Sequence, residues 1–133
     1  MTPGRSLKPL RRPLLWSGLW ICAIALVVVV SLVPAPELPD LPRGSDKIEH
    51  FLAYGVLAAA AVQLYARWPA LLGAGIGLVL LGIGLEHAQG ALTQTRIMDR
   101  WDALANTLGV IAGLATRLTP WCDALLRFDS KRP

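Results

Sequence analysis

The chain has 133 residues, of which 54% are hydrophobic and 17% are charged, and its formal net charge is +4. A soluble domain carries about 25% charged residues, so this composition cannot cover a single core with polar surface. A disordered chain is also excluded, because such chains are poor in hydrophobic residues. The basic residues lie near the two ends of the chain, which is typical of a membrane anchor rather than of a nucleic-acid-binding face.

Four apolar segments are long enough to cross the ~30 Å hydrocarbon layer, which takes about 20 helical residues. Residues 14–33 carry no charge, and this run exceeds the apolar core of a signal peptide, so we expect an uncleaved anchor. The prolines between residues 34 and 42 prevent the helix from continuing. The other segments are residues 47–66, 70–89 and 101–118. The sequence therefore predicts one domain, residues 1–133, with an all-α fold: an integral membrane bundle of four transmembrane helices.

The distribution of Lys and Arg predicts the orientation of this bundle. Nine of the 13 basic residues lie near the chain ends and the loop at Arg67, whereas four lie in the other two loops. Because Lys and Arg favour cytoplasmic loops, we expect both termini in the cytoplasm. The loops around residues 34–45 and 90–100 then lie on the outer face.

Polar residues concentrate where the helices meet those two outer loops. Asp46 and His50 share one face of the second helix, one turn apart. Glu86 and Asn106 lie in apolar helices, where a charge costs at least ~2.5 kcal/mol and normally faces a partner or a wet cavity. We therefore predict a ligand-binding polar cluster at the outer end, formed by Asp46, Lys47, His50, Tyr54, Glu86, Gln89, Arg96, Asp99, Asp102 and Asn106.

Some of these residues also have purely structural interpretations. Asp46 and Asp102 could each cap a helix and complement its dipole, and Arg96 with Asp99 could form a solvated loop. His87 is expected to pack at a helix interface. The histidines and cysteines lack the spacing of a metal motif, so we expect no metal and no other cofactor.

Glycines predict how the helices pack. Gly75 and Gly82 share a face of the third helix, and Gly109 and Gly113 share a face of the fourth with Asp102. Small faces let helices approach closely, so we expect the third and fourth helices to meet along these glycines. The spacing of Gly109 and Gly113 serves contacts within the chain or a homo-oligomer equally well.

Short motifs surround these positions in a fixed order. Ser31-Leu32-Val33-Pro34 leaves the first segment, and Asp46-Lys47-Ile48-Glu49-His50-Phe51-Leu52-Ala53-Tyr54 enters the second. Glu86 and Gln89 end the third, and Arg96 and Asp99 precede Asp102-Ala103-Leu104-Ala105-Asn106-Thr107-Leu108-Gly109. In these motifs the chain resembles the VanZ-like family of small bacterial membrane proteins, named after a protein associated with resistance to the glycopeptide teicoplanin. The resemblance implies a cell-envelope protein, multi-pass in the bacterial cytoplasmic (inner) membrane.

Three functions follow from these observations and stay open. In the first, the cluster binds an amphiphilic or lipid-linked envelope ligand or a glycopeptide, with Lys47 and Arg96 holding anionic groups. In the second, an intramembrane enzyme uses His50 as a base, oriented by Asp46 or Asp99, and Glu86 as an acid. In the third, a small transporter uses Glu86 as a proton site and works as an oligomer. We expect the first, with membrane lipid as a partner, no nucleic acid and no catalysis.

Overall fold

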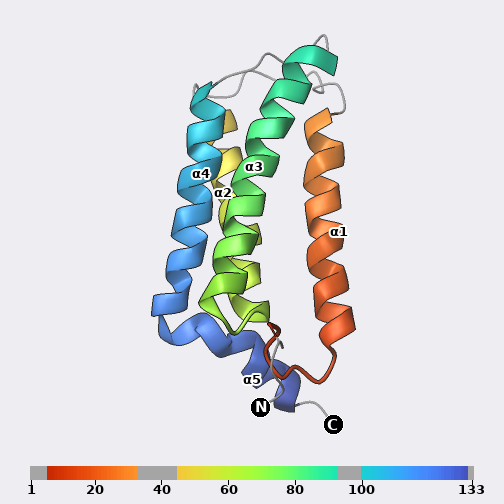
Figure 1. The fold of residues 1–133 in the computed structure, drawn as a ribbon, viewed down its shortest axis with the longest axis vertical. Coiled ribbons are helices and arrows are strands. Elements are labelled where there is room, and N and C mark those ends of the chain that lie inside the picture. The colour runs from red at the N-terminus through yellow and green to blue at the C-terminus, as the bar shows by residue number, and fades with distance from the viewer. Residues whose placement is uncertain (1–5, 33–44, 93–99, 132–133) are drawn as a thin grey trace.

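The computed structural model describes residues 6–32, 45–92 and 100–131 (Figure 1). Within these ranges every long element is an α-helix, which confirms the predicted all-α class. The segments predicted at residues 14–33, 47–66, 70–89 and 101–118 correspond to the first four helices. The helices are α1 (Pro13–Leu32), α2 (Ser45–Leu64), α3 (Trp68–Leu92), α4 (Arg100–Ala115) and α5 (Ala124–Lys131), and the 3-10 turns η1 (Thr116–Leu118) and η2 (Pro120–Asp123) join α4 to α5.

Helices α1 to α4 lie side by side, and each runs antiparallel to the one before it (Figure 1). The N- and C-termini lie together at one end, which we call the termini end. At the other end, which we call the loop end, α1 and α3 finish and α2 and α4 begin. Residues that are far apart in the sequence, near positions 50, 86 and 102, therefore share one end of the molecule.

The outer surfaces of these helices are strongly apolar. By length and composition two of the described helices could cross a membrane, Pro13–Leu32 and Trp68–Ala88, and no residue of α1 is buried. Helix α4 has only 16 residues, and α2 begins with charged residues. Large apolar side chains are nevertheless exposed on each of the four helices, among them Leu19, Ile21, Leu52, Val56, Ile76, Leu80, Leu108 and Ile111.

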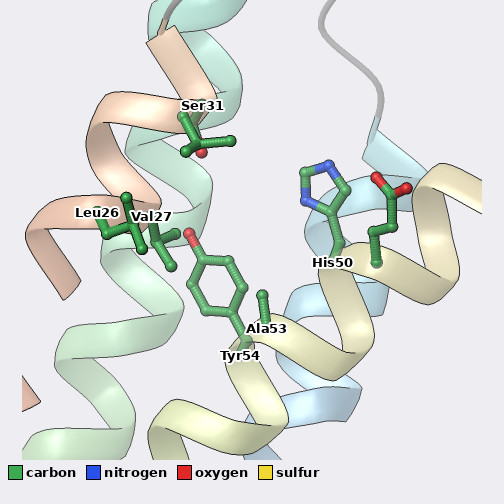
Figure 2. A pocket seen from close by; sticks show the side chains of 8 residues that line it. Leu26, Val27, Ser31, His50, Ala53 and Tyr54 are labelled. Carbon is green, nitrogen blue, oxygen red and sulfur yellow. The ribbon is translucent and has the colours of Figure 1, made fainter. Parts of the chain in front are cut away.

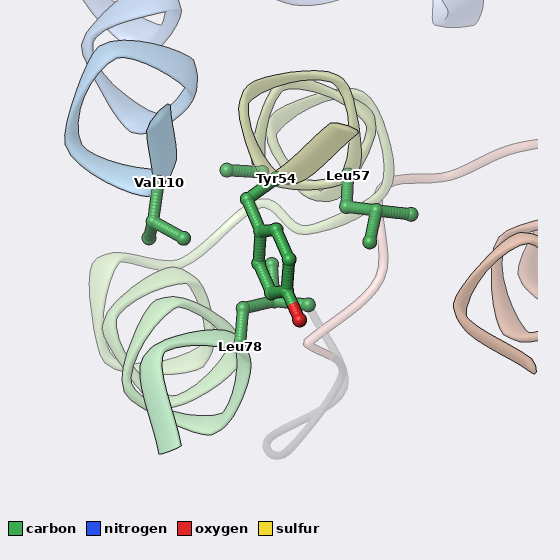
Figure 3. Packing of buried hydrophobic residues seen from close by; sticks show 5 residues of the cluster. Tyr54, Leu57, Leu78 and Val110 are labelled. Carbon is green, nitrogen blue, oxygen red and sulfur yellow. The ribbon is translucent and has the colours of Figure 1, made fainter. Parts of the chain in front are cut away.

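Helix α2 lies at the centre of the packing. Its Tyr54 and Leu57 form a buried cluster with Leu78 of α3 and Val110 of α4 (Figure 3). Helix α1 packs against this cluster only through half-buried side chains, and the indole Nε1 of Trp20 donates a hydrogen bond to the Leu57 carbonyl at 2.9 Å. Helices α2, α3 and α4 therefore form a tight core, and α1 lies against its side.

Glycines allow α4 to pack closely against its neighbours. Gly109 and Gly113 of α4 do not face α3, the helix that the sequence predicts. A Cβ atom on Gly82 of α3 would lie 2.9 Å from Asn106 Nδ2, so α3 does meet α4 at a glycine as predicted. Gly109 and Gly113 instead lie against the α2 backbone, at the carbonyl oxygens of Phe51 and Gly55. This corrects the predicted pairing of these two glycines with α3. The pattern of small residues on α4 shows a face for close approach but not which neighbour approaches it.

Gly75 of α3 also lies at the α4 interface, since a Cβ atom there would meet Leu114 Cδ1 at 2.7 Å. Gly55 of α2 has the same role toward α4, because its nearest neighbour across the interface is the Gly109 carbonyl oxygen. Sequence patterns singled out Gly75 but not Gly55. Helices α2 and α4 thus meet backbone against backbone at Gly55 and Gly109.

The termini end is closed by polar contacts that join the two ends of the chain. Lys8 Nζ lies 2.7 Å from Asp123 Oδ1 and donates to the Cys122 carbonyl at 2.5 Å. The buried Asp129 carboxylate of α5 accepts a hydrogen bond from Trp16 Nε1 at 3.0 Å and others from the backbone N–H groups of Arg11 and Arg12. Helix α5, which lies beyond the last segment predicted from the sequence, therefore caps the termini end.

Candidate functional site

Polar side chains from three helices converge at the loop end around the imidazole of His50. We call this group the His50 cluster; its members are Lys47 and His50 of α2, Glu86 of α3, and Asp102 and Asn106 of α4. His50 Nδ1 lies 3.0 Å from Asn106 Oδ1 and 3.9 Å from Glu86 Oε1, and His50 Nε2 lies 3.7 Å from Asp102 Oδ2. Lys47 Nζ lies 3.5 Å from Asp102 Oδ1. Glu86, Asp102 and Asn106 are only 3%, 7% and 2% exposed.

Helical spacing places each member on an inward face. Lys47 and His50 are three residues apart on α2, and Asp102 and Asn106 are four apart on α4, so each pair occupies one side of its helix. Glu86 follows Gly82 by one turn on α3. Because Gly82 has no side chain, Asn106 reaches between α3 and α2 and contacts His50.

The contact with Asn106 defines the orientation and tautomer of the His50 ring. An amide oxygen only accepts hydrogen bonds, so the His50 Nδ1 that faces Asn106 Oδ1 donates. In the neutral imidazole the other nitrogen, Nε2, is then an acceptor. That nitrogen faces a carboxylate oxygen of Asp102 at 3.7 Å, which exceeds the 2.7–3.2 Å of an N–H···O hydrogen bond.

A pocket of about 260 Å³ lies between α1 and α2 beside the cluster (Figure 2). Its apolar wall comes largely from α1, where Leu26, Val27 and Val30 line it. Its polar groups are those of Ser31, Glu49, His50 and Tyr54. Figure 2 shows the Tyr54 ring projecting from α2 with its hydroxyl toward α1. His50 thus belongs to the pocket and to the buried cluster at once.

Most of the predicted site residues that the structure describes come together. Lys47, His50, Glu86, Asp102 and Asn106 form the cluster, and Tyr54 lines the adjoining pocket.

The other predicted site residues are not seen in the His50 cluster or the pocket. Asp46 and Gln89 belong to α2 and α3, but their side chains lie outside the described part of the chain, as do Arg96 and Asp99 altogether. The prediction for His87 is wrong, because this side chain is exposed. It follows Glu86 directly, and one step along a helix turns a side chain by about 100° onto another face.

Two of the polar residues that line the pocket were not predicted as site residues. Ser31 and Glu49 occur in the motifs quoted above but in no predicted binding set. Their role depends on the approach of α1 to α2, which periodicity within either helix does not specify. The signal available was their position at the loop-side ends of two neighbouring apolar segments.

The chain matches no family model, no curated protein and no solved structure. The chemistry of the site is therefore inferred from its own groups. An imidazole, two buried carboxylates and an amide can exchange protons, hydrogen-bond a polar group or hold a cation. The neighbouring apolar wall can hold a hydrocarbon chain.

Proposed function

We propose that the chain is a multi-pass protein of the bacterial cytoplasmic membrane, akin to the VanZ-like proteins, in which α1 to α4 all cross the bilayer. The exposed apolar side chains of α2 and α4 support this assignment, because water-soluble proteins rarely expose large contiguous apolar surface. Both termini then lie in the cytoplasm, in keeping with the excess of Lys and Arg near the termini end. The His50 cluster and its pocket face outward.

The function we assign to this site is binding of an amphiphilic or lipid-linked envelope ligand. The proposal rests on the position of His50. This residue lines the apolar pocket and also lies beside Glu86, Asp102 and Asn106 of the His50 cluster. A ligand with a polar group and a hydrocarbon chain matches both parts: the polar group meets His50 and Tyr54, and the chain lies along Leu26, Val27 and Val30 of α1.

A pair of α1 variants tests this proposal. Val27 lines the pocket, whereas Val29 is exposed on α1 outside the pocket lining. Val27→Trp should fill the pocket and weaken binding of a radiolabelled polyprenyl-linked envelope precursor to the purified protein in lipid nanodiscs. We expect the Kd to rise about tenfold or more, which corresponds to a loss of about 1.4 kcal/mol in binding free energy. Val29→Trp is the matched control and should bind like the unmodified chain.

Competition with teicoplanin in the same assay distinguishes a precursor from a glycopeptide ligand. Displacement from the unmodified chain and from Val29→Trp would link this site to glycopeptide resistance. Equal binding by Val27→Trp and Val29→Trp would exclude the pocket as the binding site.

One observation favours a second candidate, an intramembrane acid–base enzyme. His50 borders the pocket and is flanked by two carboxylates, an arrangement that suits a general base with an orienting acid. Among the described side chains, Asp102 is placed to orient the imidazole, while the predicted Asp46 and Asp99 lie outside them. Turnover of a lipid-linked precursor by the purified chain should then fall in His50→Ala and in Glu86→Gln, and equal turnover in all three would remove these roles.

A further inference from the structure

His50 and Asp102 face each other with atoms that can both bind a cation. With Nδ1 donating to Asn106, His50 Nε2 and Asp102 Oδ2 are two acceptors that face each other at 3.7 Å. Lys47, 3.5 Å from Asp102 Oδ1, supplies one positive charge beside this pair, and a proton or a metal ion between the two atoms would supply another. A proton on Nε2 would draw the pair to hydrogen-bond distance, whereas a metal ion ligated by both atoms holds them farther apart.

The observed separations are close to those around a shared metal ion. Ligand atoms at 2.0–2.2 Å from one Zn²⁺ are at most about 4.4 Å apart, and about 3.3–3.6 Å apart in a tetrahedral site. One ligand atom from each of His50, Glu86 and Asp102 lies within 4.8 Å of the other two. His50 Nε2 already faces Asp102, whereas Glu86 lies nearer to Nδ1, so Glu86 would have to rotate toward Nε2 to complete the site.

The role of Asn106 supports the same conclusion. A metal-ligating histidine almost always donates its second ring N–H to a hydrogen-bond acceptor, which orients the ring and fixes the tautomer. Asn106 Oδ1 provides this acceptor at 3.0 Å from His50 Nδ1 and leaves Nε2 as the ligand atom.

The charges that face the site favour a divalent ion. Glu86 and Asp102 are buried carboxylates, and among the described side chains Lys47 lies 3.5 Å from Asp102. Lys47 is 38% exposed in its side chain and can withdraw toward the loop end. The ion would reach the site through the pocket that His50 lines.

From these contacts we infer that His50, Glu86 and Asp102 form a binding site for one first-row divalent cation of the Zn²⁺ type. A nitrogen ligand with two carboxylates is a donor set that Zn²⁺ accepts, with a further position left for water or a ligand group. The three ligands come from three different helices, so no sequence spacing could reveal them. The inference does not depend on the proposed amphiphile.

Equilibrium titration of the purified full chain in detergent tests the site. Cys22 and Cys122 are first replaced by Ser, because free thiols would bind Zn²⁺ themselves. After chelation, Zn²⁺ titration against a chromophoric competitor should show one equivalent bound. His50→Ala should weaken binding by more than about 100-fold, since even residues that only hydrogen-bond to ligands contribute 10–100-fold.

The chain supplies matched controls. His87 is its other histidine and is exposed beside Glu86, so His87→Ala should leave binding unchanged. Lys47→Gln removes a nearby positive charge and should tighten binding on the order of tenfold. The near-isosteric Glu86→Gln and Asp102→Asn serve if His50→Ala changes the gel-filtration profile or the circular dichroism. Failure to bind Zn²⁺, or equal binding with and without the His50 imidazole, would overturn the site.

Discussion

The backbone of Gly109 in α4 lies directly against the Phe51 carbonyl oxygen in α2, with no side chain between the two helices. This contact fixes the distance between α2 and α4. That distance in turn places Asp102 and Asn106 within reach of His50, because all three lie within two turns of the contact.

Gly109→Ala should therefore destabilise the protein. The added methyl group would clash with backbone, which cannot rotate away as a side chain can, and overpacking of this kind costs about 1–3 kcal/mol. We expect a lower melting temperature in detergent. Gly84→Ala is the control, because nothing lies within 4 Å of a Cβ atom there. A Gly109→Ala protein as stable as Gly84→Ala would contradict the close approach.

The hydrogen bond that attaches α1 to the core gives a second prediction. Trp20 Nε1 donates to the Leu57 carbonyl, and Trp20→Phe removes this donor while it keeps an aromatic ring. We expect a loss of about 0.5–1.5 kcal/mol in the free energy of unfolding, the usual net worth of one hydrogen bond. Trp121→Phe, at an indole that is 72% exposed, should have little effect on the same unfolding measurement.

The attachment of α5 should depend on pH. Hydrogen bonds from the Trp16 indole and from the backbone of Arg11 and Arg12 lower the pKa of Asp129. A carboxyl whose pKa is lowered by folding stabilises the folded form above its unfolded pKa of about 3.9, and this stabilisation is lost as the pH falls through the folded value. A spin label on Ser130→Cys, in the chain without Cys22 and Cys122, should become mobile in that acidic range.

Asp129→Asn provides the comparison for this titration. The label should already be mobile at pH 7, and its mobility should change much less on acidification. The pH dependence that is left belongs to Asp123, whose pKa is lowered chiefly by its hydrogen bond from Lys8. Identical pH profiles with and without the Asp129 carboxyl would show that α5 is held by other contacts.

The proposed topology predicts opposite labelling of the two ends. Glu49 is exposed near the loop end and Arg67 near the termini end. In intact cells, a membrane-impermeant maleimide should label Glu49→Cys and leave Arg67→Cys unlabelled until the cells are opened. Both variants are made without Cys22 and Cys122. The reverse pattern would place the His50 cluster on the cytoplasmic side.

Much of the fold is readable from the sequence because apolar length and proline positions are local signals. The four long helices follow from them. The meeting of His50, Glu86 and Asn106 follows too, since polar residues in apolar helices need partners. Which helix packs against which cannot be predicted from the sequence. The packing of α4 on α2 depends on contacts such as that of Gly55 with Gly109, which join distant parts of the chain.

Contacts between distant parts of the chain also explain why α5 and the proposed metal site were not predicted from the sequence. The helix α5 is short and amphipathic, and it depends on Asp129 reaching residues more than one hundred positions earlier in the chain. Likewise the three possible metal ligands are separated by long stretches of chain, whereas known metal motifs are recognised by short spacing.

Helix α1 buries none of its residues, yet it supplies the apolar wall of the pocket. If α1 spans a bilayer as proposed, that wall has hydrocarbon on its far side, and an amphiphile would enter the pocket sideways from the lipid without passing through water. Occupancy would then follow the mole fraction of the ligand among the lipids rather than its concentration in water. Diluting the ligand with bulk lipid at a fixed total concentration should empty the site.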